Sequence, residues 1–122
     1  MRLFVIPILF TLSTAPALAN SCQEFKDRQE EYSRQNELLF DKYEKVKKDR
    51  DLNKATNKDV CQAIYDTIKL RKADLENDIN YMNCDCKYNP EKCSKATSAV
   101  AFNKEQLANM TRFAKKNCSI KK

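Results

Sequence analysis

Apolar residues recur at steps of three and four along most of the chain, a spacing that places them on one face of an α-helix. Short polar breaks at residues 52–56 and 83–89 divide this pattern into three segments. We therefore expect helices over residues 22–51, 57–83 and 90–118, each presenting one apolar stripe to its neighbours. Because the connections are short, the helices should alternate in direction. The pattern predicts an all-α fold, a three-helix antiparallel bundle of long helices.

Each predicted stripe holds seven to nine residues. In the first segment these are Cys22, Phe25, Gln29, Tyr32, Asn36, Leu39, Phe40, Tyr43 and Val46. In the second they are Cys61, Ile64, Tyr65, Ile68, Leu75, Ile79 and Met82. In the third they are Cys93, Ala96, Val100, Leu107, Met110, Phe113, Ala114 and Cys118. Gln29 and Asn36 could fix the register of the first helix, as polar residues do in coiled coils, but we expect them at a solvent-exposed edge.

Composition agrees with helices. The chain of 122 residues has no glycine and three prolines. Tight β-turns need residues that tolerate positive φ, and glycine adopts it most readily, so a β-rich fold is disfavoured. Thr56 or Asn57 can cap the second helix, and Pro90 suits the first turn of the third.

The first residues have the pattern of a cleaved signal peptide. A short positive start precedes an apolar run from Leu3 to Leu12, and small residues follow up to Ala19. Cleavage there would remove residues 1–19, expected as an extra helix in the uncut chain, and leave residues 20–122 as a single domain. A membrane anchor is an alternative, but the run is shorter than the roughly 20 residues that span a bilayer. Lipidation of Cys22 is a second alternative.

Six cysteines in a small exported chain are typical of a disulfide framework. In an antiparallel hairpin, residues equidistant from the turn lie side by side. Cys61 and Cys118 are equidistant from a break between Asn89 and Pro90, and Cys22 and Cys86 are equidistant from Lys54. The spacing therefore predicts Cys61–Cys118 as the firmest pair.

The remaining cysteines allow two arrangements. We favour Cys22–Cys86 with Cys84–Cys93 over the exchange of Cys84 and Cys86 between these pairs. Thiolates of Cys84, Cys86 and Cys93 could instead hold a soft metal or act in redox chemistry. Structural zinc usually takes four Cys or His ligands, and the chain has no histidine. We therefore expect structural disulfides and no metal or other cofactor.

Catalytic motifs are missing from the sequence. General acid–base and acyl-transfer sites most often use histidine, and phosphate-binding or nucleophile-elbow loops need glycine. The many carboxylates of residues 22–51 alternate with lysine and arginine, as on a solvated helix. We therefore do not expect an enzyme.

Charge is concentrated near the carboxyl end. The whole chain carries +6, and residues 90–122 hold eight basic and two acidic residues. Lys104, Arg112, Lys115 and Lys116 project opposite the third apolar stripe. This basic face, which the tail at 119–122 extends, could bind an anionic partner or only maintain solubility. Leu38 and Phe102, apolar residues outside the stripes, are alternative protein contacts.

Together these features predict a non-catalytic periplasmic or secreted interaction protein with a protein partner in the cell envelope. An inhibitor, an immunity-type factor and an accessory subunit of an envelope machine all fit. The alternative is a binder of anionic envelope surface, such as lipopolysaccharide or phospholipid headgroups, through the basic third helix. Nucleic acid is not expected as a partner, because aromatic residues do not interleave with the basic ones. Nor do we expect an integral membrane protein.

Overall fold

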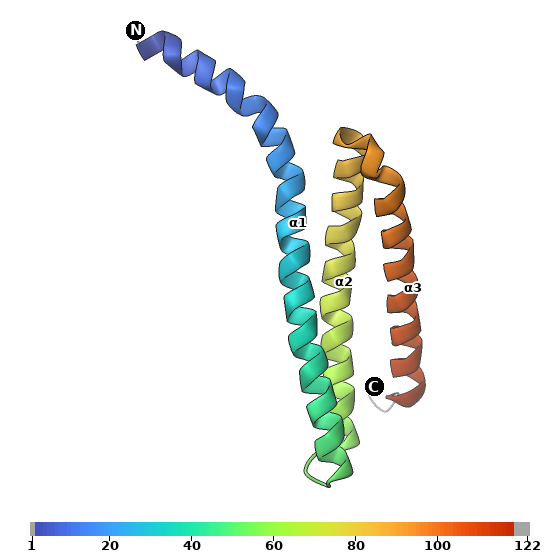
Figure 1. Ribbon diagram of the computed structural model, residues 1–122. Coiled ribbons are helices and arrows are strands. Elements are labelled where there is room, and N and C mark those ends of the chain that lie inside the picture. Colours follow the sequence, from blue (N-terminus) through green and yellow to red (C-terminus); the bar gives the residue numbers. More distant parts are fainter. Residues whose placement is uncertain (1, 119–122) are drawn as a thin grey trace.

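The computed structural model describes the backbone of residues 2–118 and the side chains of residues 22–118. It contains three long helices and one short 3-10 helix: α1 (Arg2–Asp51), α2 (Asn57–Tyr88), η1 (Pro90–Lys92) and α3 (Cys93–Asn117). No strand occurs in the described part of the chain. The prediction of an all-α fold is confirmed, and successive long helices run in opposite directions (Figure 1).

The helix α1 includes the predicted leader. We expected residues 1–19 as a separate helix, but the helical backbone is continuous from Arg2 to Asp51. The part upstream of Cys22 extends past the end of α2 (Figure 1). Cleavage by signal peptidase stays a prediction. The predicted basic tail at residues 119–122 lies outside the described residues.

The connection between α1 and α2 turns without glycine. Asn53 adopts a φ of 63°, the left-handed conformation that asparagine tolerates better than most residues. Thr56 is the N-cap of α2, as one of the two predicted alternatives required. Its hydroxyl accepts from the Asp59 backbone N–H at 3.2 Å, and the Asp59 carboxylate accepts from the Thr56 backbone N–H at 2.9 Å. This reciprocal capping box satisfies two N–H groups at the helix start.

The second break is shorter than predicted. α2 continues to Tyr88, five residues past the expected end at residue 83. No proline or glycine occurs between residues 57 and 89. Pro90 is the first helix breaker after the start of α2, and it disfavours helical backbone at the preceding residue, Asn89. The Asn89 backbone N–H donates to the Asp85 carbonyl at 2.7 Å and ends the helix. Pro90 then begins η1 rather than α3, which starts at Cys93.

The three helices form an open arrangement with α2 in the middle. α2 packs against both α1 and α3, whereas within the described residues no Cα atom of α1 lies within 8 Å of one of α3 (Figure 1). A closed three-helix bundle would bring all three pairs into contact. Here parts of the faces of α1 and α3 that a closed bundle would bury stay exposed, among them Phe40 and Phe113.

The apolar core lies in the half of the molecule near the Cys61–Cys118 disulfide. Its buried members are Val60, Cys61, Ile64, Ile68, Ala114 and Cys118. Tyr43, Val46, Leu107 and Met110 pack against them while partly exposed. The core therefore draws on all three helices at this end.

All six cysteines are in disulfides, as predicted, and Cys61–Cys118 is the expected pair. The favoured arrangement of the other four is wrong, because Cys22 bonds to Cys84 and Cys86 bonds to Cys93. The reason is the extra length of α2. Two residues along a helix turn the side chain by about 200°, so Cys84 faces α1 and Cys86 faces the chain that returns as α3.

Candidate functional site

A groove runs between α1 and α3 over the surface of α2. Two adjoining cavities of about 380 and 640 Å³ share the lining residues Tyr43, Ile64 and Phe113, and so form one trough. The first is also lined by Asn36, Phe40, Thr67, Arg71, Gln106, Asn109 and Met110. The second is also lined by Lys47, Arg50, Asn57, Val60, Cys61, Asn117 and Cys118. Each of the long helices contributes one stripe of side chains to it.

Two aromatic rings stand exposed on the walls of this groove. Phe40 on α1 is 57% exposed and Phe113 on α3 is 50% exposed. Both belong to the stripes predicted to face inward, so the prediction of their burial is wrong. Periodicity correctly identifies the apolar faces, but α1 and α3 do not close over one another to cover them. Apolar surface left open in this way is a frequent mark of a protein contact.

Positive charge stands at both ends of the groove. Arg71 lines one cavity, and Lys47 and Arg50 line the other. Among side chains 22–118, no carboxylate lines either cavity.

The carboxylates that pair with Lys47 and Arg50 are exposed, whereas Arg71 lies near half-buried Asp74 and donates to Asn36. Glu44 lies 3.9 Å from Lys47, and Asp51 lies 3.4 Å from Arg50. Exposed pairs of this kind contribute roughly 0–1 kcal/mol. An incoming carboxylate could replace either of them at little cost.

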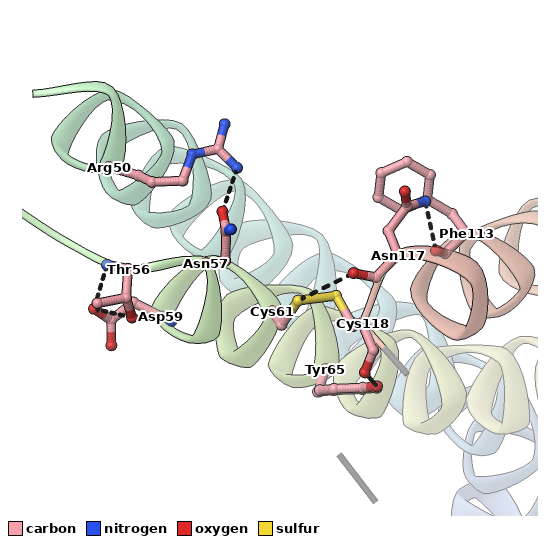
Figure 2. The surroundings of a disulfide bond; sticks show 9 residues. All are labelled: Arg50, Thr56, Asn57, Asp59, Cys61, Tyr65, Phe113, Asn117 and Cys118. Carbon is pink, nitrogen blue, oxygen red and sulfur yellow. Dashed lines mark hydrogen bonds between the residues drawn. A yellow bond between two sulfur atoms is a disulfide. The ribbon is translucent and has the colours of Figure 1, made fainter. Parts of the chain in front are cut away.

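The end of the groove near the first loop is held by polar contacts and a disulfide (Figure 2). Arg50 Nη1 of α1 donates to Asn57 Oδ1 of α2 at 3.1 Å. Lys47 Nζ lies 5.2 Å from the centre of the Tyr43 ring, within reach of a cation–π contact. Figure 2 shows the Cys61–Cys118 disulfide joining α2 to the end of α3 that carries Phe113. The tie between α2 and α3 thus fixes the wall that carries Phe113.

No family model, no curated protein and no solved structure matches this chain. A function is therefore inferred from its own side chains.

Beyond the groove, a buried carboxylate joins all three helices. Asp78 of α2 is 6% exposed. One of its oxygens accepts from Gln29 Nε2 of α1 at 3.1 Å, and the other accepts from Asn103 Nδ2 of α3 at 2.8 Å. Buried Asn77 adds a bond from its Nδ2 to the Phe25 carbonyl of α1 at 2.9 Å. The half of the molecule away from the apolar core is thus held by a polar cluster.

Gln29 and Asn36 keep part of their surface exposed, as expected for an edge position, but they also take part in the contact with α2. Both are half-buried and bond across to α2, since Arg71 Nε donates to Asn36 Oδ1 at 3.2 Å. The Gln29–Asp78 and Asn36–Arg71 pairs, like the Cys22–Cys84 disulfide, are equidistant from Asn53 to within one residue. These contacts therefore set one constant register along the α1–α2 pair.

Asp74 of α2 lies close enough to Asp78 for their charges to interact. Its Oδ1 is buried without a hydrogen-bond partner among the described side chains. Burial and, secondarily, the negative charge of Asp78 raise the pKa of Asp74 to about 6, against the opposing effect of Arg71. The Asp74 carboxyl therefore ionises at a higher pH than an exposed aspartate does, although it is mostly charged at pH 7.

The predicted basic face is exposed on α3. Lys104, Arg112, Lys115 and Lys116 are all exposed, and none lines the groove. The alternative contacts Leu38 and Phe102 are 57% and 61% exposed and also lie outside the groove lining. The structure therefore separates three surfaces: the groove, the basic face and two isolated apolar side chains.

The disulfides also bear on the alternative roles of the cysteines. With Cys84 bonded to Cys22 and Cys86 bonded to Cys93, these sulfurs are not thiolates. No group of three or more Cys, Asp or Glu side chains in the described region is placed to hold a metal ion. In the same region, no helix combines the length and the apolar character needed to cross a membrane.

Proposed function

We propose that this protein is a non-catalytic interaction protein that works outside the cytoplasm and seats a protein partner in the groove between α1 and α3. The observation that carries the proposal is the exposure of Phe40 and Phe113, two aromatic rings on opposite walls of the groove. Aromatic anchors that a partner can bury completely dominate the binding energy of most protein interfaces.

The proposed location rests on the disulfides. Three disulfides persist in the periplasm or outside the cell, whereas cytosolic reductants keep most thiols reduced. The predicted signal peptide agrees with export. An inhibitor, an immunity-type factor or an accessory subunit of an envelope machine would each use such a module.

Site-specific photo-crosslinking tests the proposal. Phe113→p-benzoylphenylalanine places the crosslinker on the groove wall, and Phe102→p-benzoylphenylalanine places it at a similarly exposed position of the same helix, outside the groove. In the cells that produce the protein, we expect a discrete adduct from position 113 and none from position 102. Phe40 and Leu38 offer a second matched pair on α1, both 57% exposed.

Two outcomes contradict the proposal. Adducts of equal yield from positions 113 and 102 would show that contact is not confined to the groove. Absence of adducts from both groove positions would show that no partner occupies it.

A second candidate is an anionic envelope surface bound by the basic face of α3. The observation in its favour is the exposure of four basic side chains on one helix: Lys104, Arg112, Lys115 and Lys116. Reversal of all four to glutamate should abolish binding to vesicles of anionic phospholipid or to lipopolysaccharide and leave the fold intact. Wild-type binding should also weaken with salt, because the Debye length falls from about 10 Å at 0.1 M to about 3 Å at 1 M. Binding unchanged by the reversal would leave the basic face as a solubility feature.

A further inference from the structure

The walls of the groove limit what kind of backbone can occupy it. All three walls are helices, whose backbone N–H and C=O groups bond within each helix. They offer no strand edge to which an extended peptide could add. A peptide that buries its backbone here must satisfy its own hydrogen bonds, which a helix does.

The length of the groove fits such a helix. On α1 the lining extends from Asn36 to Arg50, and on α2 from Asn57 to Arg71. The first and last lining residues of each helix are 14 positions apart in the sequence, which corresponds to about 21 Å along a helix that rises 1.5 Å per residue. A helix of about 14 residues would therefore fill the trough and contact α1, α2 and α3 together.

The charges of the groove indicate which kind of residue the two ends of that helix should carry. Arg71 stands at one end and Lys47 and Arg50 at the other, with the apolar rings between them. A complementary ligand is apolar in its middle and acidic at both ends. A single fatty acid or lysophospholipid has one anionic head and would meet the cations of only one end.

From these features we propose that the occupant of the groove is an amphipathic helix of the partner protein, about four turns long, with an apolar face in the middle and acidic residues at both ends. The proposal rests on the proposed function, since it names the chemistry of the partner at the same site. Its apolar face would pack between Phe40 and Phe113, and its acidic ends would meet Lys47 and Arg71.

A synthetic peptide provides the probe. It is a labelled helical peptide of about 16 residues, with leucine at i, i+3 and i+4 spacing along one face and glutamates at both ends. The first control peptide carries lysines in place of the glutamates. The second keeps the composition but scatters the leucines around the helix. Fluorescence anisotropy with the oxidised full chain measures each affinity.

We expect binding of the first peptide and at least about tenfold weaker binding of either control. Phe113→Ser should weaken binding by about 30-fold, the loss usual for a buried aromatic anchor, whereas Phe102→Ser should not change it. Lys47→Glu should weaken binding by about tenfold, and Lys48→Glu, an equal charge change outside the groove lining, should have less effect. All four positions are at least partly exposed, so helical content by circular dichroism should stay unchanged.

The remaining outcomes overturn the inference. Equal binding of the acidic and basic peptides would refute the charge argument, and an unchanged affinity of Phe113→Ser would place the peptide elsewhere. Displacement of a lipophilic dye by palmitate, with no binding of the acidic peptide, would identify an acyl-chain site instead. If the peptide fails but the groove still crosslinks to a protein in cells, the helical ligand is wrong and the proposed function survives.

Discussion

Replacing Asp74 by asparagine should stabilise the folded protein near neutral pH. The wild-type carboxylate is half-buried beside Asp78, and its Oδ1 lacks a partner. Asparagine has nearly the same shape but no charge, and its amide can donate toward Asp78 one helical turn away. The substitution therefore removes a repulsion and supplies a donor.

The magnitude follows from the pKa of Asp74, which the folded state raises from 3.8 to about 6. A rise of this size corresponds to about 3 kcal/mol for a group fully shielded from water, since a tenfold change in acidity is worth about 1.4 kcal/mol. Asp74 is only half-buried, so solvent screening reduces the expected gain to about 1 kcal/mol. For a domain of about 100 residues this corresponds to a Tm higher by about 4 °C or slightly more.

The sign of the pH dependence is specific. Between about pH 4 and pH 6 the folded state binds more protons at Asp74 than the unfolded state does, so the wild-type protein loses stability as pH rises through this window. Asparagine does not titrate. The gain from Asp74→Asn should therefore be present at about pH 7 and vanish at about pH 4, where the wild-type carboxyl is neutral in the folded state.

Thermal unfolding of the oxidised protein, followed by circular dichroism at both pH values, measures this gain. Glu76→Gln is the matched control, because it removes one negative charge from an exposed position of the same helix. A Tm of Asp74→Asn below that of the wild type at about pH 7 would refute the reasoning. So would an increase of equal size at about pH 4, because it would not depend on the charge.

Three further predictions concern the crosslinks, the buried carboxylate and the cap. Digestion on the amino side of all aspartates under non-reducing conditions should release residues 78–84 still joined to the peptide that carries Cys22, and mass spectrometry would show any other pairing. Asp78→Asn, made in the Asp74→Asn background, should cost about 1–3 kcal/mol in chemical unfolding, because the new NH2 group would face one of the two side-chain donors and cannot accept from it. A loss below about 0.5 kcal/mol would mean that the three-helix contact contributes little. Thr56→Ala should cost about 1 kcal/mol through loss of the N-cap, measured in the same way, and no change would contradict the capping geometry.

Much of the fold could be predicted from the sequence, because helix periodicity and capping are local properties. The cap at Thr56 and the pairing of Cys61 with Cys118 both follow from residue order. The partner of Cys84 does not follow from residue order. It depends on whether the helix continues through residues 83–88, where the polar residues of the local pattern predict a break.

The candidate site was harder to predict. Apolar spacing places Phe40 and Phe113 on the inner faces of their helices, but only the packing of α1 and α3 decides whether another helix covers them. Asp78 was missed for the opposite reason. A carboxylate in a helix normally indicates solvent, and no local signal shows that two amides from distant helices will satisfy it. The equal spacing of Gln29 and Asp78 from the first turn was the one available clue.

The disulfides also determine how the chain responds to proteolysis. The Cys22–Cys84 bond and the first loop close one covalent ring, and the other two bonds close further rings that include parts of α2 and α3. As a result, any single peptide-bond cut between Cys22 and Cys118 leaves the two fragments joined. A protease that cuts one loop or helix would therefore leave the helices that form the groove linked. On a non-reducing gel the cut protein would run as one species, heavier than the intact chain by only one water molecule. Loss of a fragment requires two cuts or reduction, so the oxidised molecule can tolerate damage that would dismantle a linear bundle.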